Sequence, residues 1–539
     1  MRVAIIGAGP AGLAAGEVLS RRDVQVEIFE ASDIVGGMAR SFALWGQTVD
    51  LGPHRFFSQD PTVNQFWLDV VGADVRMVDR LTRIFYRDRF FRYPLEARNA
   101  LWNMGSFEAA RCVGSYLAQK VAPGLSDGLE GTFEGWVVER FGRRLFEIFF
   151  QAYSEKLWGI SCRDLDADFA AQRIKKFSLA AAIWSALGLG GGLHATLVDR
   201  FAYPTGGSGL VYERLAARIR ERGGRVETRW PIRGFVHDHG VVRGLHFANG
   251  ETRCFDHVIS TMPLTQLVRG LGPLPALVAG AVEQLRFRNT ILVYLNVDAR
   301  DLFPDQWLYV HSPELRTGRV TNFRNWVPEL YGDSPTSILA LEYWCDDEDP
   351  LWTESEECLL ARAAREIRST GLIGSAAILD GKIVRVHRSY PVYRAGYRAH
   401  LDQVVAYLNR FEGLTPIGRG GSFKYNNQDH SLLMGLLAAE NLLDGKHHRL
   451  WSVNTDYQTY QEAAEIAHAS FAPHLGKRLT PAPVSPRENS GDTRMNSGGK
   501  YSGDQDPCRI RYGVPGIIRI RYGVPRIMAS RLSDRSRGP

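Results

Sequence analysis

Two short strand patterns with a helical pattern between them open the chain. Val3 to Ile6 form a continuous apolar run, and residues 24–29 alternate apolar and polar side chains up to Glu30. Both patterns predict strands. The segment Gly7-Ala-Gly-Pro-Ala-Gly12 and a helical stretch lie between them. This order of strand, turn, helix and strand predicts a complete dinucleotide-binding unit.

Each glycine of the turn has a physical role in such a unit. Gly7 allows the tight turn out of the strand, Gly9 lets the backbone approach a pyrophosphate, and Gly12 lets the helix pack closely on the sheet. The helix that begins at Pro10 and Ala11 points its free N–H groups at the phosphates. We therefore predict these five residues to bind a cofactor.

An acidic residue closes the second strand. Glu30 follows Gly12 by eighteen residues, where its carboxylate can accept both hydroxyls of a ribose. An acid at this position favours an unphosphorylated ribose. We include the adjacent Ala31 among the cofactor-binding residues.

Helical patterns dominate from about Thr62 to Arg173, for example at 132–142 and 144–150, and strand patterns follow. The strand patterns lie at 225–229, 234–237, 240–247, 255–260, 289–296, 338–343 and 382–387. This alternation predicts an α/β fold, with a Rossmann-like nucleotide-binding domain (a parallel sheet with helices) assembled from separated segments. Inserted helical and antiparallel-sheet domains would hold the substrate.

The predicted boundaries follow from these patterns. The nucleotide-binding domain takes 1–75, 205–265 and 410–447, the helical insert 76–204, the sheet-rich insert 266–409, a C-terminal helical segment 448–478, and a disordered basic tail 479–539.

The composition is that of an ordinary globular enzyme. Of the 539 residues, 45% are hydrophobic and 23% charged, which is enough for two or three cores. Six scattered cysteines without a Cys-x-x-Cys pair predict neither a disulfide framework nor a metal site, and favour a reducing, cytoplasmic location. The chain begins with a strand pattern rather than a secretory leader, which agrees with that expectation.

The net charge of +6 belongs to the tail. Residues 481–539 hold eleven Arg or Lys against five Asp or Glu, so the first 480 residues carry 54 of each sign. The segment 509–515 recurs at 519–525, which favours a tandem duplication; an arm that touches nucleic acid or acidic lipid is the alternative. No nucleic acid partner is required for the predicted function.

The longest apolar run, Ser178 to Leu193, follows two lysines and contains four glycines. Its sixteen residues are fewer than the roughly 18 that suggest a membrane span. We expect a buried helix and a glycine loop; a patch that touches a membrane is the alternative. No transmembrane segment is predicted.

Three later segments extend the cofactor site. Gly37 and Arg40, with Met38 and Ala39 between them, resemble the second phosphate clamp of FAD-binding proteins of the amine-oxidase group, and so favour FAD over NAD. The segment Gly52-Pro53-His54 follows. The remaining predicted contacts are Ile232, Gly418, Arg419, Asn427, Gln428, Asp429 and Ser431, the last four just before a helical pattern at 432–443.

Longer motifs, in a shared order, carry a family resemblance. They are 52–58 (GPHRFFS), 92–95 (RYPL), 132–136 (TFEGW), 156–159 (KLWG), 171–174 (AQRI), 259–263 (ISTMP), 306–309 (QWLY) and 425–431 (YNNQDHS). Over roughly residues 1 to 450 the chain resembles the UDP-galactopyranose mutases, in particular their eukaryotic-type branch. These belong to a wider group of FAD-dependent amine oxidases and protoporphyrinogen oxidases.

The resemblance implies an enzyme that interconverts the pyranose and furanose forms of a nucleotide-linked sugar through N5 of a reduced FAD, without net redox change. A departing diphosphate needs fixed cations. Arg173 and Arg319 stand at the family's two diphosphate arginines, and His54 at the histidine beneath the flavin. These three are the predicted catalytic residues.

The resemblance also implies substrate-binding residues. Tyr309, Tyr390 and Tyr425 stand at positions that hydrogen-bond the diphosphate, while Trp158 and Trp307 stand at aromatic positions of the active site. Tyr93 and Glu96 belong to the segment that meets the uracil.

The chain departs from the family in that segment and near the lysine motif. Glu96 replaces a glutamine, Ser154 and Glu155 replace an asparagine pattern, and the segment before Asn427 is two residues shorter. An ionised carboxylate accepts hydrogen bonds but donates none, so it cannot match both edges of a uracil amide. The identity of the nucleotide therefore stays open.

Two other functions use the same scaffold. One is an FAD-dependent oxidoreductase of the amine oxidase, protoporphyrinogen oxidase or desaturase type, and the other is a catalytically silent flavoprotein. Convergence of Arg173 and Arg319 on one pocket would favour the mutase. An uncharged tunnel lined by aromatic residues would favour the oxidoreductase. Since no second dinucleotide motif is present, an external reductant such as NAD(P)H would have to enter the substrate cleft.

Overall fold

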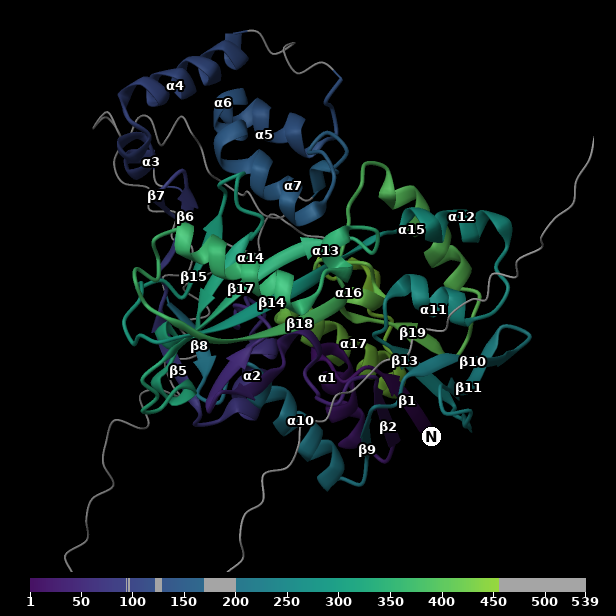
Figure 1. Cartoon of the computed structure of the whole chain (residues 1–539). Coiled ribbons are helices and arrows are strands. Elements are labelled where there is room, and N and C mark those ends of the chain that lie inside the picture. Colours follow the sequence, from purple (N-terminus) through teal and green to yellow (C-terminus); the bar gives the residue numbers. More distant parts are fainter. Residues whose placement is uncertain (94, 96, 122–127, 169–199, 455–539) are drawn as a thin grey trace, which may run out of the picture. The chain divides into compact units, whose positions relative to one another are not determined.

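A computed structural model gives the structure of residues 1–454 apart from 94, 96, 122–127 and 169–199 (Figure 1). The chain divides into two units, Met1–Leu479 and Thr480–Pro539, and every described residue belongs to the first. The predictions for the apolar run 178–193, the tail 479–539 and its repeated segments, and most of 448–478, concern residues outside this described part.

A five-stranded parallel sheet carries the glycine-rich turn. Its strand order is β19-β13-β1-β2-β9. The strands are β1 (Arg2–Ile6), β2 (Gln25–Glu30), β9 (Arg225–Thr228), β13 (His257–Ser260) and β19 (Leu414–Pro416). They come from three distant parts of the sequence. The predicted α/β class, with a parallel sheet assembled from separated segments, is confirmed.

Helices α1 (Pro10–Ser20), α10 (Gly209–Glu221) and α17 (Gln428–Asp444) accompany this sheet (Figure 1). Glycine sets how closely α1 and α17 approach. A Cβ atom added to Gly435 of α17 would lie 2.3 Å from the carbonyl oxygen of Ala11 and 2.9 Å from Cβ of Ala14. The two helices therefore touch backbone to backbone at this point.

A seven-stranded sheet forms the second layer, in the order β18-β14-β17-β16-β15-β6-β7. Its strands are β6 (Thr82–Tyr86), β7 (Arg89–Arg92), β14 (Phe287–Val297), β15 (Trp307–Val310), β16 (Arg319–Asn322), β17 (Ser337–Cys345) and β18 (Ile378–Pro391). All its neighbours are antiparallel except β15 and β6. This sheet positions Tyr309, Arg319 and Tyr390.

The remaining strands form three small antiparallel pairings: β3 (Ser41–Leu44) with β4 (Gln47–Asp50), β5 (Val75–Asp79) with β8 (Arg200–Pro204), and β10 (Ile232–Asp238) with β11 (Val241–Phe247) and β12 (Thr252–Cys254).

The other helices are α2 (Pro61–Val71), α3 (Ala97–Met104), α4 (Ser106–Val121), α5 (Phe133–Phe141), α6 (Arg143–Phe146), α7 (Ala152–Trp158), α11 (Leu264–Gly270), α12 (Ala276–Gln284), α13 (Pro350–Thr353), α14 (Glu356–Ser369), α15 (Tyr397–Leu408) and α16 (Gly418–Gly421). Short 3-10 turns lie at Gly37–Ala39, Phe323–Asn325, Pro328–Leu330 and Leu450–Ser452, and a π-helix at Glu147–Gln151 joins α6 to α7.

One predicted helical region is wrong in part. The stretch 75–92, within the predicted helical part of the chain, forms β5, β6 and β7. Pairing with distant partners decides the outcome, because β5 pairs with β8 and β6 with β15. Strand formation depends on such tertiary partners more than helix formation does. The predicted helix at 432–443 also begins earlier, at Gln428, because the Asn427 side chain caps it together with His430.

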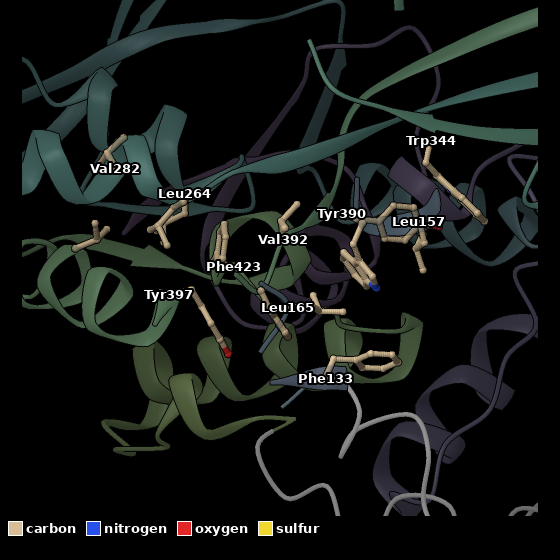
Figure 2. Packing of buried hydrophobic residues seen from close by; sticks show 14 of the residues in the cluster. Phe133, Leu157, Leu165, Leu264, Val282, Trp344, Tyr390, Val392, Tyr397 and Phe423 are labelled. Atoms are coloured by element: carbon tan, nitrogen blue, oxygen red, sulfur yellow. The ribbon is translucent and has the colours of Figure 1, made fainter. Parts of the chain in front are cut away.

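The largest core cluster joins the helical insert to the rest of the first unit. It contains Phe133 and Leu165 of the insert, Leu264 and Val282 of α11 and α12, and Phe423 beyond α16 (Figure 2). Because these side chains pack in one cluster, the helical insert packs directly against the nucleotide-binding part of the protein. The domain boundaries within this unit stay a prediction.

The contact between α1 and α17 gives a stability test. Gly435→Ala should destabilise the protein by about 1–3 kcal/mol, since its methyl group meets backbone. Gly280→Ala is the matched control: this exposed glycine of α12 has open space around its added Cβ, so alanine should stabilise by roughly 0.5–1 kcal/mol. Urea unfolding measures both. Equal effects would contradict the close helix contact.

Candidate functional site

Two glycine segments face each other at the start of α1. Gly9 caps the helix, and a Cβ added to Gly37 would lie 3.1 Å from the Gly9 Cα. The Gly36 N–H donates to the Ala8 carbonyl at 2.7 Å, which fixes the second segment against the first. The free N–H groups of the helix N-terminus open onto this cradle. The residues present therefore fit a bound diphosphate.

Gly7 and Gly12 serve the fold of this turn. Gly7 has a φ of 94°, and a Cβ on it would lie 2.1 Å from Oγ1 of Thr261. A Cβ on Gly12 would lie 2.0 Å from the Gly7 carbonyl oxygen. Neither position has room for a side chain, so both glycines are needed before any ligand binds.

Glu30 is held in place at the carboxyl end of β2. Its Oε2 accepts the Ala8 N–H at 2.8 Å, while its Oε1 accepts the N–H and hydroxyl of Ser32 at 2.9 and 2.8 Å. A carboxylate has about four acceptor sites, so Oε2 keeps one for a ribose hydroxyl. The Trp230 N–H donates to the Glu30 carbonyl at 2.8 Å and brings the segment before Ile232 alongside.

The loop Gly52-Pro53-His54 is anchored by a buried carboxyl. Asp50 accepts hydrogen bonds from Ser41 Oγ, from the Tyr203 hydroxyl at 2.7 Å and from the Ser208 N–H at 3.2 Å. Although these bonds favour ionisation, burial dominates and raises the pKa of Asp50 to about 7. The carboxyl is thus partly protonated near neutrality.

Arg319 and Glu342 form a buried ion pair beside this loop. Arg319 Nε donates to Glu342 Oε1 at 2.6 Å, and Nη2 donates to Oε2. The side chains are 14% and 1% exposed. Burial lowers the pKa of Arg319, but the Glu342 charge outweighs it and raises that pKa well above its usual range. A Cβ on Gly52, which has a φ of 129°, would lie 2.9 Å from Glu342 Oε1.

His54 is held neutral. Burial, followed by the charges of Arg419 and Arg319, lowers the pKa of its imidazole to about 3. Its Nδ1 is buried and has no hydrogen-bond partner among the described residues. Its carbonyl accepts the Ser208 hydroxyl at 2.8 Å and Gln428 Nε2 at 3.0 Å, which hold the loop in place.

Arg419 lies against two stacked tyrosines. Tyr390 and Tyr425 stack at 5.3 Å and 13°, and the Arg419 guanidinium lies 5.3 and 5.4 Å from their ring centroids. Trp158 meets Tyr425 edge-on at 5.7 Å. Arg419 Nε donates to the Asn426 carbonyl at 2.8 Å, while its buried Nη1 has no partner within the described part of the chain. Burial and the adjacent Tyr425 raise the pKa of Tyr390 to about 12.

A second aromatic group lies beside Arg319. Tyr309 of β15 contacts Tyr93 at 4.9 Å and Tyr153 at 5.6 Å, and Tyr153 meets Trp344 at 5.8 Å. Arg319 lies 6.0 Å from the Trp344 ring. Of the predicted substrate-binding residues, Tyr93 and Tyr309 are thus brought together here.

Trp307 is not part of either group. It stacks on Trp326 at 5.8 Å and packs near Phe201, in the core between the sheet and β8. Its side chain is buried, and its Nε1 has no hydrogen-bond partner among the described residues. Sequence position alone could not separate it from Tyr309, two residues further along the same strand.

The start of α17 is tied to the His54 loop. Gln428 donates to the His54 carbonyl and, at 3.2 Å, to Ser208 Oγ, and accepts the Tyr212 hydroxyl. Both ends of its amide are thus bonded to protein groups, so we assign Gln428 to positioning the loop. Asp429 and Ser431 are buried in the first turn of α17.

The other predicted cofactor residues lie near this cradle. A Cβ on Gly418 would lie 3.1 Å from Cβ of Ala11. Met38 and Ala39 form a 3-10 turn that ends at the half-buried Arg40. Arg173 and Glu96 lie outside the described residues, so their predicted roles stay predictions.

Two functional candidates were missed by the sequence reasoning. Glu342 carried a usable signal, because it is the one charged residue in the apolar strand pattern 338–343. A charge in a buried strand normally has a partner. Tyr153 carried no such signal, since an aromatic residue in a helix is ordinary core.

The fold and the cradle define a flavin-binding or dinucleotide-binding protein. The chain belongs to the family described as flavin containing amine oxidoreductase, whose model matches residues 10–403. The flavin cofactor predicted from the glycine segments therefore has family support, and FAD fits the cradle.

Solved structures show the same fold. Reduced UDP-galactopyranose mutase matches with a TM-score of 0.73 and 20% identity, over 85% of this chain and 96% of that chain. Putrescine oxidase bound to putrescine matches with a TM-score of 0.55 and 15% identity, over 82% and 99%. At these identities the likeness establishes the fold alone.

Curated relatives cover less of the sequence. The zeta-carotene-forming phytoene desaturase of Myxococcus xanthus is 26% identical over 327 residues, which are 56% of this chain and 60% of the relative. The coproporphyrinogen III oxidase of Staphylococcus aureus is 32% identical over 97 residues, 17% of this chain and 21% of the relative. The chain thus spans between a fifth and three fifths of these relatives.

Two further properties concern the described part of the chain. Its helices include none that is both long and apolar enough to cross a membrane. Within the same ranges, three or more His, Cys, Asp or Glu side chains nowhere gather in a way that could hold a metal ion.

Asp50 gives a pH test. Its pKa is raised in the folded protein above the value of 3.8 for an exposed aspartate, so the folded state holds the proton more tightly. The stability that Asp50 contributes is therefore complete below about pH 4 and lost as the pH rises to about 7. Relative to Asp50→Asn, the wild type should lose about 2–4 kcal/mol between pH 4 and 8. Urea unfolding across this range measures the difference, and a constant difference would contradict the assignment.

Gly9 separates cofactor binding from folding. Its φ of −85° suits any residue, and an added Cβ would lie 3.8 Å from the nearest protein atom, Cα of Gly37. Gly9→Ala should therefore leave the melting temperature of the apoprotein unchanged but weaken FAD binding about tenfold or more, because the methyl group obstructs the diphosphate. Gly12→Ala, which clashes with backbone, should lower the melting temperature as well. Normal FAD titration of Gly9→Ala would refute the cradle.

Proposed function

We propose that this protein is a flavin-dependent isomerase that interconverts the pyranose and furanose forms of a nucleotide-linked sugar. The observation that carries the proposal is the convergence of two guanidinium groups, those of Arg319 and Arg419, on His54. Arg319 Nη2 lies 3.7 Å from a Cβ built on Gly52, two residues before His54, and the Arg419 guanidinium lies 5.3 Å from the Tyr390 ring centroid. Both charges lower the pKa of the His54 imidazole. Two half-buried guanidinium groups, one paired with Glu342 and one with an unpaired Nη1, suit a substrate with a diphosphate.

The sequence predicts that Arg419 contacts the cofactor; here we propose that it binds the substrate instead, because its hydrogen bonding suits an anionic substrate. A buried donor left without an acceptor costs roughly 1–3 kcal/mol, and more when it is charged. The described residues offer no acceptor to Nη1 of Arg419, and a phosphate oxygen would supply one. An amine would be repelled by this charge, and a polyene would leave it unsatisfied. The electrostatics therefore favour the mutase over the oxidoreductase.

The residues of the chain have separate roles in this proposal. Gly9, Gly37 and Glu30 would hold the FAD, which when bound supplies a ring nitrogen, N5, that can act as a nucleophile in its reduced form. Tyr390, whose pKa is raised to about 12, stays protonated and can donate to a phosphate oxygen. Neutral His54 accepts or donates a hydrogen bond without adding charge.

Several finer assignments complete the proposal. Arg173 would add a further cation, and Tyr309, Tyr425 and Trp158 would complete the substrate pocket. The reduced state of the flavin would come from an external reductant such as NAD(P)H. The described cysteines are free thiols, which supports a reducing compartment and a cytoplasmic site of action.

The test is an anaerobic turnover experiment. Dithionite-reduced holoenzyme is incubated with UDP-galactofuranose, and chromatography scores the appearance of UDP-galactopyranose while the absorption spectrum follows the flavin. We expect conversion with the flavin still reduced at the end. If no sugar is converted, and an amine or a polyene instead reduces the oxidised flavin, the oxidoreductase replaces the mutase.

Arg419→Met probes the cationic pocket. Loss of the guanidinium should weaken substrate binding about tenfold or more, with FAD retained, because the diphosphate loses a charge-assisted hydrogen bond. Arg173→Ala should act in the same direction. Arg243→Met, which removes an exposed arginine of β11, is the control and should change nothing. Loss of FAD from Arg419→Met would assign this arginine to the cofactor instead.

A further inference from the structure

Four strongly exposed apolar side chains gather on α3 and α4. Trp102 is 86% exposed, Phe107 77%, Leu117 55% and Val121 86%. They are half of the eight large apolar side chains that are exposed in the described part of the protein, although they fall within twenty residues of sequence. Two aromatic rings this exposed already present about 300 Å² of apolar surface. We take this concentration of exposed apolar side chains as a candidate interaction surface.

The exposed apolar residues of α4 lie along one side of that helix, where they form a stripe. Phe107, Leu117 and Val121 occur with Ala110 and Gly114 at spacings of three and four, which places all five on one face of α4. The opposite face contains the buried Cys112 and Gln119. Figure 1 shows α4 at the outer edge of the helical insert, with α5 and α6 beside it.

The segment that carries this stripe is rich in basic residues. The stretch 80–121 holds eight Arg or Lys against three Asp or Glu, whereas the first 480 residues are balanced. Arg111 and Lys120 lie exposed on α4 itself, and Arg87 and Arg89 lie exposed on the adjoining hairpin. The pairing of Arg111 with Glu108, at 3.3 Å on the surface, neutralises little of this charge.

We propose that α4, with Trp102 at the end of α3, docks on an anionic lipid surface. Apolar side chains enter the boundary between headgroups and acyl chains, and the arginines and lysines meet the acidic headgroups. A second copy of this chain is a poorer partner, because a twofold contact would set one basic rim against another. This docking is independent of the sugar chemistry proposed above.

The test is flotation of the full-length FAD-loaded protein with vesicles. Vesicles of phosphatidylcholine with phosphatidylglycerol should carry the protein upward, those of phosphatidylcholine alone far less, and added salt should weaken the binding. Phe107→Glu with Leu117→Glu should abolish binding. Arg111→Gln with Lys120→Gln should weaken it roughly tenfold or more, since each cation near such a surface contributes about 1 kcal/mol.

Leu277→Glu is the matched control. Leu277 is 69% exposed on α12, away from the stripe in sequence and helix, so its replacement should leave binding unchanged. Circular dichroism and FAD content verify that each variant is folded. In the wild type, hydrogen exchange of residues 102–121 should slow when anionic vesicles are added, which tests the same surface without substitution.

Four results would overturn the proposal. The first is absence of flotation with any vesicle, and the second is equal loss of binding in Leu277→Glu. The third is a wild-type dimer by sedimentation that Phe107→Glu with Leu117→Glu converts to a monomer, because the stripe would then be an interface between copies. Unchanged hydrogen exchange in the presence of vesicles has the same consequence.

Discussion

The first turn of α1 is enclosed by backbone, and this close approach constrains the rest of the nucleotide-binding part. A Cβ added to Gly12 would meet the Gly7 carbonyl, one added to Gly435 of α17 would meet the Ala11 carbonyl, and one added to Gly418 would meet the Ala11 side chain. Protein interiors are packed so densely that one additional methyl group in such a place lowers the stability of the fold. The N-terminal N–H groups of α1 are therefore held in one position, which is what recognition of a diphosphate by backbone requires.

The second determinant is where the chain buries charge. Arg319 and Glu342 are buried as a pair when the protein folds, and the hydrogen bonds between them compensate for the hydration that both charges lose. Arg419 is fixed by one backbone carbonyl and two tyrosine rings, and keeps donor capacity. This part of the site thus combines a cation neutralised by a carboxylate with one whose Nη1 has no acceptor among the described residues. The aromatic rings beside the two arginines provide flat, uncharged surfaces.

The sequence determined the class of fold because its signals there are local. The glycine turn and the strand patterns at 3–6, 24–29, 225–229 and 255–260 are each recognised from a few consecutive residues, and the structure has strands there. The short edge strand β19 was not among the predicted strands. The strands at 75–92 were missed because their partners, such as β15, lie far away in the chain. Trp307 and Tyr309 differ only through tertiary packing, and the partnership of Arg319 with Glu342 joins two strands that no local pattern links.

The assembly of the parallel sheet from distant segments has a consequence for synthesis of the protein. β1 pairs with β13 and β13 with β19, while α1 packs on α17, so the cradle needs residues from both ends of the first unit. A chain emerging from the ribosome holds its glycine turn long before residues 414–444 exist. Contacts so far apart in sequence form late and slowly. The flavin can therefore be captured only when synthesis of this unit is nearly complete, and until then the apolar strand β1 needs protection from other partners.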